Sequence, residues 1–406
     1  MKVLAVNKYY FVKGGAEKYF FELGRILERY GNDVIPFAMR HELNEPTPYE
    51  RFFVSTELFD DRGSVRDRLR AAARVLYSVE ARRSIEALVD ATRPDVAHLH
   101  NIAHQLSPSI LYGLRDRGVP VVQTLHDYKL ICPNYQMLIR GATCERCATW
   151  RYYNAVLNRC MRDSLAASAL VAAESYLHKM LGTYTRGVDL FIAPSAQLRK
   201  KMIAHGVDGQ KIVHVPNAIA LDSYAPSYAS EGYAAYVGRL SSGKGLGTLL
   251  SALKLAPSVA FRIAGSGPLE HELRMAASAQ AIDNVEFVGY KRGSELADLV
   301  KGALFVVVPS ECYENSPMAI HESFAHGKAV VGSRIGGIPE LISEGETGLL
   351  FEPGDSEGLA GCLRRLWDDP AWALDMGRAA RQRAESEYGQ ELHYERVMAV
   401  YERVTS

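Results

Sequence analysis

Short apolar runs alternate with segments of helical periodicity along the chain, and this alternation restricts the fold more than any other feature. Most runs lack period-two alternation, which is typical of strands in a parallel sheet that helices cover on both faces. The runs predicted to be strands are residues 3–7, 33–37, 95–100, 120–125, 190–194, 233–238, 260–264, 285–288, 304–309 and 329–332. Strands that alternate with helices predict a doubly wound α/β architecture.

A stretch rich in turn-forming residues interrupts this alternation near the middle of the chain, at residues 213–225. It separates two strand–helix series of similar size, and 406 residues suit two or three domains. We therefore expect an N-terminal domain at 1–213, a C-terminal domain at 214–384, and a final helix at 385–406 that packs back on the first domain. Two facing open sheets form a cleft, and ligands bind at the carboxyl ends of such strands.

The segment 128–188 is too long for an ordinary crossover, and insertions of this kind usually carry function or bind partners. It holds Cys132, Cys144, Cys147 and Cys160, of which the middle two form a C-x2-C pair. Four thiols in one insertion resemble a structural zinc site, although their spacing is not that of a standard finger. The alternatives are ordinary thiols, or oxidised pairs in a purified sample.

Charge and hydropathy exclude several classes of protein. Basic and acidic residues number 47 each, which argues against a whole-protein clamp on nucleic acid, so we expect no nucleic-acid partner. No apolar stretch is long enough to span a bilayer, and the N-terminal run is predicted to be a strand rather than a signal peptide. Six cysteines in such a chain do not indicate a disulfide scaffold, so a cytoplasmic location is expected.

The most informative stretch is PSECYENSPMAIHE at residues 309–322, which begins where a predicted strand ends. Ser316 is suited to cap a helix and Pro317 to occupy its first position. The N–H groups of the opening turn would then form an anion site. Glu314 precedes this helix and Glu322 lies about two turns into it, so both can accept hydrogen bonds from one ligand's hydroxyls.

Complementary positive charge follows the predicted strand at 233–238. Arg239 offers a planar fork and Lys244 a point charge, and both suit phosphate oxygens. The glycines around them allow close approach of a ligand. Cations, carboxylates and a helix N-terminus together indicate a nucleotide-sugar site. The alternative is a solvated lysine and exposed helical carboxylates.

In their order along the chain, these motifs resemble those of glycosyltransferase family 4, which has the two-domain GT-B fold and a Glu-x7-Glu signature. Each motif alone is weak, but the set spans essentially the whole chain. The matching segments are Gly14-Gly15-Ala16-Glu17, residues 95–101, residues 124–127, Gly238-Arg239 with Lys244-Gly245, Gly265-Ser266-Gly267-Pro268, residues 309–328 and Gly336-Gly337-Ile338-Pro339-Glu340.

The resemblance implies a role for each matching residue. Arg239 and Lys244 would hold the donor diphosphate, Glu322 the ribose and Glu314 the donor sugar, and His126 would contact the sugar near the reacting carbon. The implied catalytic set is His126, Arg239, Lys244 and Glu314. The implied donor-binding set is Gly14, Gly15, Arg239, Lys244, Gly265, Tyr290, Glu314, Asn315, Ser316, Met318, Ala319 and Glu322.

The family transfers sugars with retention at the anomeric carbon and without an obligatory divalent metal. Front-side attack, in which a donor phosphate oxygen takes the acceptor's proton, is the mechanism that the resemblance suggests. One departure is Asn315-Ser316-Pro317 in place of the commoner glycine–aromatic–glycine, because Pro317 lacks an N–H. Among other histidines, His98 is expected to be a packed strand residue, and His100 to belong either to the core or to the site.

Two other functions are compatible with these motifs. A nucleotide-sugar epimerase would turn over the donor without an acceptor, and a non-catalytic nucleotide-sugar binding protein would release no nucleotide. A nicotinamide dehydrogenase is disfavoured, because the first predicted strand leads to Lys13-Gly14-Gly15-Ala16 and not to G-x-G-x-x-G.

The resemblance also suggests the acceptor, a glycan or lipid-linked glycan in cell-surface polysaccharide assembly. Arg151, Tyr152, Tyr153 and Lys179 accompany an apolar helix, and such a helix can lie at a membrane surface. It can equally pack on the first domain. The expected location is the cytoplasm, with peripheral contact at the inner face of the membrane.

Overall fold

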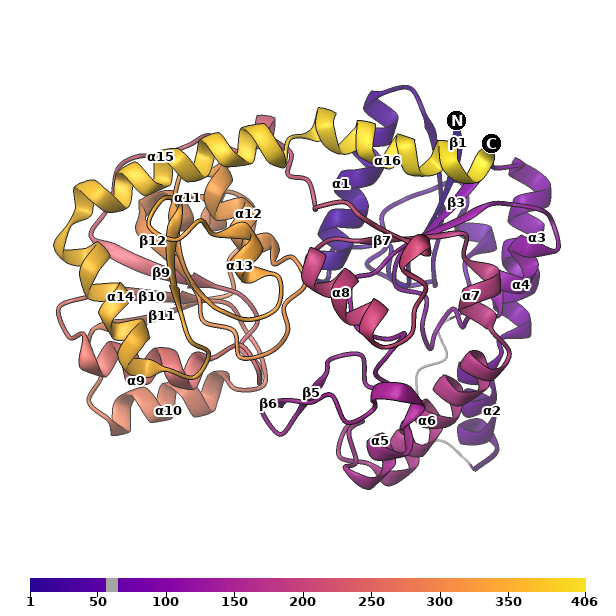
Figure 1. Ribbon diagram of the computed structural model, residues 1–406, viewed down its shortest axis with the longest axis horizontal. Helices are drawn as coiled ribbons and strands as arrows, with labels where there is room; N and C mark the ends of the chain where they lie inside the picture. Colours follow the sequence, from indigo (N-terminus) through magenta and orange to yellow (C-terminus); the bar gives the residue numbers. More distant parts are fainter. Residues whose placement is uncertain (56–64) are drawn as a thin grey trace. The chain divides into compact units, whose positions relative to one another are not determined.

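The computed structural model describes residues 1–55 and 65–406, which divide into two compact α/β units. Unit 1 comprises Met1–Gln136, Glu145–Pro216 and His393–Ser406, and unit 2 comprises Met137–Cys144 and Asn217–Leu392. In the described part of the chain, each unit is built on a six-stranded sheet in which every neighbouring pair is parallel (Figure 1).

The sheet of unit 1 has the order β2-β1-β3-β4-β7-β8, so the chain order reverses between β1 and β3. Its strands are β1 (Lys2–Val6), β2 (Asp33–Phe37), β3 (Val96–Leu99), β4 (Val121–Thr124), β7 (Leu190–Ala193) and β8 (Ile212–His214). The register is set by buried residues: Val3 of β1 lies opposite Val34 on one side and Val96 on the other. Both faces are covered, which explains why these strands are continuously apolar.

Unit 1 contains the helices α1 (Gly15–Arg29), α2 (Val65–Leu76), α3 (Val79–Thr92), α4 (Ile110–Arg115), α7 (Thr183–Gly187), α8 (Ala196–Ala204) and α16 (Gln390–Thr405). Of these, α1 and α16 pack on the sheet through apolar residues. Tyr19, Leu23 and Leu27 of α1 recur every four residues and share one buried cluster with Val397 and Tyr401 of α16. The end of the chain therefore belongs to the core of unit 1. Helix α15 (Pro370–Glu387) precedes α16 and belongs to unit 2.

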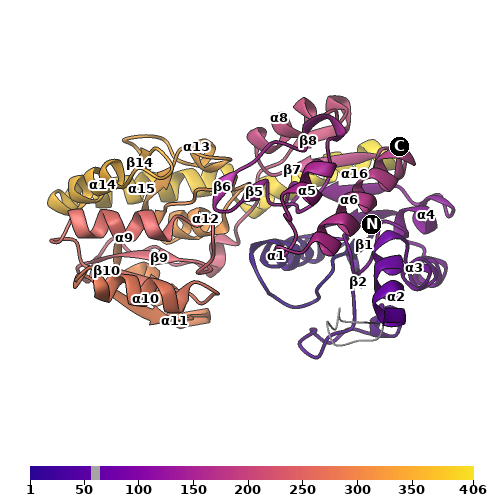
Figure 2. The same ribbon diagram turned by 90° about the horizontal axis from the view of Figure 1, so that it is seen from below.

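The predicted insertion is an irregular, partly helical region. An antiparallel hairpin of β5 (Leu138–Ile139) and β6 (Ala142–Thr143) groups with unit 2. Helices α5 (Tyr153–Leu157) and α6 (Leu165–Met180) belong to unit 1 and lie side by side in both views (Figures 1 and 2). None of the helices in the described residues is both long enough and apolar enough to cross a membrane.

The sheet of unit 2 has the order β11-β10-β9-β12-β13-β14. Its strands are β9 (Tyr233–Val237), β10 (Phe261–Ala264), β11 (Val285–Gly289), β12 (Ala303–Val308), β13 (Ala329–Ser333) and β14 (Gly348–Phe351). The remaining helices are α9 (Leu246–Leu255), α10 (Glu270–Ala279), α11 (Gly293–Gly302), α12 (Met318–Ala325), α13 (Ile338–Leu341) and α14 (Ser356–Asp368).

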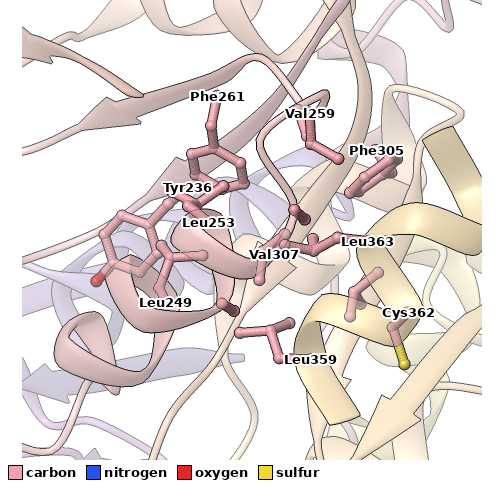
Figure 3. Close-up of a cluster of buried hydrophobic side chains, with 14 of the residues drawn as sticks. Tyr236, Leu249, Leu253, Val259, Phe261, Phe305, Val307, Leu359, Cys362 and Leu363 are labelled. Carbon is pink, nitrogen blue, oxygen red and sulfur yellow. The ribbon is translucent and has the colours of Figure 1, made fainter. Parts of the chain in front are cut away.

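The core of unit 2 consists of two apolar layers, one on each face of the sheet. On one face, Phe261 and Phe305 of the strands contact Leu253 of α9 and Leu359 and Leu363 of α14 (Figure 3). The other face is covered by apolar residues of α12, α13 and α15. The doubly wound α/β prediction is confirmed. Every predicted strand is present with ends shifted by a residue or two, whereas the short strands β5, β6, β8 and β14 were not predicted.

Candidate functional site: cations and carboxylates at the sheet edges

The centre of the unit 2 sheet is a point where the chain order reverses. From β9 the chain continues through β10 and β11 on one side, and from β12 through β13 and β14 on the other. The loops that follow β9 and β12 therefore leave the same edge of the sheet as neighbours. Ligands of open α/β sheets bind at this position. These loops, residues 238–245 and 309–317, carry the predicted cations and the first predicted carboxylate.

Backbone contacts join the two loops. The carbonyl oxygen of Gly243 accepts hydrogen bonds from the N–H groups of Glu311 and Cys312, at 2.8 and 3.1 Å. Gly245 has a φ of +67°, and a Cβ on this residue would lie 1.7 Å from the carbonyl oxygen of Pro309. A side chain at this position would separate the loops, so the glycine allows the close approach that the site needs.

Lys244 and Glu314 form the central ion pair of this edge. The Nζ of Lys244 lies 2.5 Å from Oε1 of Glu314, and the Ser310 hydroxyl donates to the same oxygen at 2.7 Å. Burial acts to lower the pKa of Lys244, but the Glu314 carboxylate outweighs it and holds that pKa above its usual value. Burial acts to raise the pKa of Glu314, and Lys244 and Ser310 together hold it below its usual value. Both side chains are therefore charged at neutral pH.

A glycine turn fixes the backbone of Glu314. The N–H of Gly337 donates to the carbonyl oxygen of Glu314 at 2.8 Å. The preceding residue, Gly336, has a φ of +60°, and a Cβ there would lie 2.1 Å from the same oxygen. The Gly336-Gly337 motif thus positions the carboxylate of a residue that is distant in sequence.

The remaining predicted donor-binding residues of unit 2 follow strands of the same sheet. Arg239 is exposed directly after β9, and its carbonyl oxygen accepts a hydrogen bond from the Tyr236 hydroxyl at 3.0 Å. Gly265 follows β10 with a φ of +145°, and a Cβ there would lie 1.8 Å from the carbonyl oxygen of Gly238. Tyr290 follows β11 and is 68% exposed.

The expected cap of the helix after β12 was wrong. Helix α12 begins at Met318, Pro317 is its N-cap, and no side chain caps it. The hydroxyl of Ser316 instead lies 2.9 Å from Nε2 of His321, a fully buried imidazole that needs a polar partner. The N–H groups of Met318 and Ala319 lie in the first turn, where no earlier helical carbonyl can accept a hydrogen bond from them.

Two other predicted residues lie beside this helix start. Glu322 is half-buried on α12, a little more than one turn from the first helical residue. Asn315 precedes Ser316, whose carbonyl oxygen accepts a hydrogen bond from the buried Asn217 at 3.3 Å.

The predicted residues of unit 1 lie at the corresponding edge of its sheet. Gly14 and Gly15 form the start of α1 after β1, and His126 follows β4. His126 belongs to a row of stacked imidazoles: its ring centroid lies 5.1 Å from that of His100, which lies 4.6 Å from that of His98. Nδ1 of His100 and Nε2 of His126 are 2.8 Å apart, so His100 holds the His126 ring in place.

Burial keeps these imidazoles uncharged. It lowers the pKa of His98 to about 3 and that of His126 to about 4, and it lowers the pKa of His100 in the same direction. His98 bonds the Tyr401 and Thr124 hydroxyls, each at 2.7 Å, so it is the packed strand residue that was predicted. His126 thus offers a neutral hydrogen-bonding ring.

The four cysteines of the insertion are the residues that the sequence predicts to hold a zinc ion. Within residues 1–55 and 65–406, no group of three or more His, Cys, Asp or Glu side chains is arranged to hold a metal ion. The thiol of Cys132 donates to Oδ1 of Asn134 at 2.9 Å. The structural zinc ion at Cys132, Cys144, Cys147 and Cys160 stays a prediction from the sequence alone.

Comparison with known proteins identifies the family. Residues 13–223 match the profile of "Glycosyltransferase Family 4", and residues 225–383 match that of "Glycosyl transferases group 1". The chain belongs to glycosyltransferase family 4. The family fold is GT-B, in agreement with the two parallel-sheet units.

Curated relatives match this chain over only part of their length. Glycogen synthase of Mycobacterium tuberculosis is 30% identical over 303 residues, which are 73% of this chain and 66% of the relative. The amylovoran biosynthesis glycosyltransferase AmsK of Erwinia amylovora is 33% identical over 178 residues, 41% of this chain and 44% of the relative. The chain thus matches about half to two thirds of the length of these relatives.

Solved structures share the fold over nearly the whole chain. Sucrose-phosphate synthase from Thermosynechococcus elongatus has a TM-score of 0.74 at 21% identity, with 99% of this chain and 98% of that chain covered. Anabaena HepE in complex with UDP-glucose has a TM-score of 0.69 at 18% identity, with 99% of this chain and 100% of that chain covered.

Sequence reasoning gave no supporting role to Ser310 or Gly243, and it left His100 open between the core and the site. Ser310, Gly243 and His100 contact the site through hydrogen bonds to Glu314, to the neighbouring loop and to His126. A usable signal existed for Ser310, because it directly follows an apolar run that ends at the same sheet edge. No local signal reveals a carbonyl contact such as that of Gly243.

Proposed function

We propose that this protein transfers a sugar from a nucleotide diphosphate-sugar donor to a glycan or lipid-linked glycan acceptor, with retention of the anomeric configuration. The observation that carries the proposal is the Lys244–Glu314 pair at the chain-order reversal of the unit 2 sheet. A fixed cation beside a fixed carboxylate suits a donor that carries a diphosphate next to sugar hydroxyls. The names of the relatives and the UDP-glucose bound to HepE support the same class of donor.

In this proposal the cations stabilise the leaving group. Breaking the bond between sugar and diphosphate places negative charge on phosphate oxygens, which Lys244 and Arg239 neutralise. Lys244 is already held by Glu314, so little reorganisation accompanies charge development. The acceptor's oxygen attacks the anomeric carbon as the bond between that carbon and the diphosphate breaks. A donor phosphate oxygen takes the acceptor's proton.

The other residues orient the donor. Glu322 accepts hydrogen bonds from the ribose, and Glu314 accepts them from the sugar. His126 contributes a neutral imidazole near the reacting carbon, because burial holds its pKa near 4. Because protein cations take the charge of the leaving group, the proposed reaction requires no divalent metal, and EDTA should leave turnover unchanged.

The name of a relative supports the acceptor and the cellular location. AmsK, which is 33% identical over 178 residues, is named for the biosynthesis of the polysaccharide amylovoran. We therefore extend the proposal to cell-surface polysaccharide assembly, carried out by a cytoplasmic enzyme at the inner face of the membrane.

Transfer is tested with a panel of nucleotide-sugars and glycan acceptors, by measuring nucleotide release and the anomeric configuration of the product. Acceptor-dependent release with a retained configuration is expected. Sugar isomerisation without acceptor would indicate an epimerase, and donor binding without release would indicate a binding protein; either result contradicts the proposal.

Variants test the site itself. Arg239→Ala and Lys244→Ala should each lower kcat/KM by about a hundredfold or more, the usual loss when one charge-stabilising donor is removed. Arg378→Ala, which removes an exposed arginine on α15, is the matched control and should retain turnover. If the Arg239→Ala variant and the Glu322→Ala variant both turned over at the wild-type rate, the assignment of the site would be wrong.

A further inference from the structure

Helix α6 differs from an ordinary surface helix because it exposes apolar side chains and buries several polar ones. Its exposed residues are all apolar: Leu165, Ala166, Ala169, Ala173, Leu177 and Met180. Its buried residues include three polar ones, Ser168, Glu174 and His178. The carboxylate of Glu174 is buried because it pairs with Nζ of Lys129 at 2.8 Å. The apolar face of α6 therefore points to solvent while its polar side chains find partners inside unit 1.

The exposed face forms a continuous stripe. Leu165, Ala169, Ala173 and Leu177 are four residues apart, a spacing that places them on one side of a helix. The large side chains at its ends are well exposed, with Leu165 at 56%, Met180 at 73% and the C-cap Leu181 at 50%. A contiguous apolar stripe of this kind marks an interaction surface.

Aromatic side chains extend the stripe at its C-terminal half. Trp150 is 46% exposed and Tyr153 is 51% exposed. The N–H of Tyr153 donates to the Tyr176 hydroxyl of α6 at 3.3 Å, and Nζ of Lys179 lies 5.5 Å from the centre of the Trp150 ring. Both aromatics thus lie beside α6, where α5 and α6 are adjacent (Figures 1 and 2). Trp and Tyr are enriched at membrane–water interfaces because one end of each ring is apolar and the other polar.

Basic residues accompany this stripe. The basic residues of the segment 146–186 are Arg146, Arg151, Arg159, Arg162, Lys179 and Arg186, against the acidic Asp163 and Glu174. Glu174 is buried, so the surface excess is greater still, although the whole chain has a formal net charge of zero. A positive excess in the segment that carries an apolar stripe complements an anionic surface.

We propose that this surface, the exposed side chains of α6 together with Trp150 and Tyr153, docks the protein on an anionic phospholipid membrane. Helix α6 lies in the plane of the interface with Leu165, Leu177 and Met180 among the acyl chains, and the arginines contact phosphate groups. A second copy of the chain is a poorer partner, because two such surfaces would bring like charges together. Docking does not depend on the proposed transfer reaction.

Vesicle sedimentation of the purified chain tests the proposal. Vesicles of phosphatidylcholine with 30 mol% phosphatidylserine are compared with vesicles of phosphatidylcholine alone. The salt concentration is about 0.1 M, because higher salt shortens the Debye length and screens the attraction to anionic lipid. The protein should sediment with the anionic vesicles, less with the neutral ones, and less again as salt approaches about 1 M. Equal binding to both vesicles, or no binding, would overturn the proposal.

The double variant Leu177→Glu with Met180→Glu should lower the partition coefficient at least about tenfold, the expected effect of withdrawing large apolar side chains from the membrane. Met275→Glu, which alters a methionine that is 59% exposed on α10, is the matched control and should bind like the wild type. If the double variant sediments with anionic vesicles as the wild type does, the assigned surface is wrong.

Two further measurements keep the test decisive. Should circular dichroism show that the double variant is unfolded, Arg151→Glu with Arg162→Glu replaces it, and binding to anionic vesicles should fall by a similar factor. Sedimentation equilibrium without lipid tests whether the surface binds a second copy of the chain instead. A wild-type dimer that either double variant converts to a monomer, without vesicle binding, would assign the surface to self-association and refute membrane docking.

Discussion

The buried imidazoles of unit 1 should lower its free energy of unfolding at acid pH. Burial lowers the pKa of His98 to about 3 and those of His126 and His393 to about 4. In the unfolded chain each imidazole titrates near its ordinary value of about 6.5. Lowering the pH from 7 to 5 should therefore protonate these imidazoles in the unfolded chain but not in the folded protein.

The sign follows from proton binding. The folded pKa values lie below the unfolded ones, so between about pH 6.5 and 4 the unfolded chain binds more protons, and the free energy of unfolding falls as the pH falls. Each imidazole loses about 2 kcal/mol between pH 7 and 5, so the three together remove about 6 kcal/mol. That is a large part of the roughly 5–15 kcal/mol by which domains are stable.

Urea unfolding at pH 7, 6 and 5 measures this dependence by circular dichroism. Pulsed hydrogen exchange with mass spectrometry assigns each transition to unit 1 or unit 2. His393→Gln keeps a polar group beside the Tyr19 hydroxyl, which lies 3.1 Å from Nε2 of His393, but it cannot take up a proton. This variant should flatten the dependence by about one proton, roughly 1.4 kcal/mol per pH unit. His271→Gln, which alters α10 of unit 2, is the control and should leave the transition of unit 1 unchanged.

Two results would refute this reasoning. One is a change of less than about 1 kcal/mol in the free energy of unfolding of unit 1 between pH 7 and 5, when linkage requires about 6 kcal/mol. The other is a His393→Gln variant with the wild-type slope. Either would mean that the imidazoles take up protons in the folded protein.

Three further predictions concern unit 2. Gly245→Ala should destabilise it by about 1–3 kcal/mol in urea unfolding because the new methyl group meets a carbonyl, whereas Gly247→Ala, in open space on α9, should stabilise it by about 0.5–1 kcal/mol. Leu359→Ala, in the fully buried core, should lower the free energy of unfolding by about 2–5 kcal/mol. Leu255→Ala alters a half-exposed leucine and should lower it by less than about 0.5 kcal/mol. Equal losses would contradict the packing shown in Figure 3. Glu314→Gln should lower transfer about a hundredfold in nucleotide-release assays while unfolding changes by only about 1–2 kcal/mol, because its lysine partner is about a third exposed.

Strand positions could be predicted from the sequence because they depend on local composition. Apolar runs such as 233–238 and 304–309 are strands in any arrangement that covers both faces of a sheet. The short strand β8 was missed because three residues beside a turn-rich stretch give too little pattern. The Ser316 cap was wrong because a local capping rule does not see the buried His321 that competes for the hydroxyl.

The sequence by itself determined where the longer strands lie, that they wind into α/β units, and which loops carry Arg239, Lys244 and Glu314. The tertiary structure alone decided that Lys244 and Glu314, 70 residues apart, form a pair, because that depends on β9 and β12 being neighbours at the centre of the sheet. It also decided that α6 turns its apolar face outward, since Lys129 supplies the partner that allows Glu174 to be buried. Such pairings arise from contacts between segments distant in sequence, and local propensity carries no information about them.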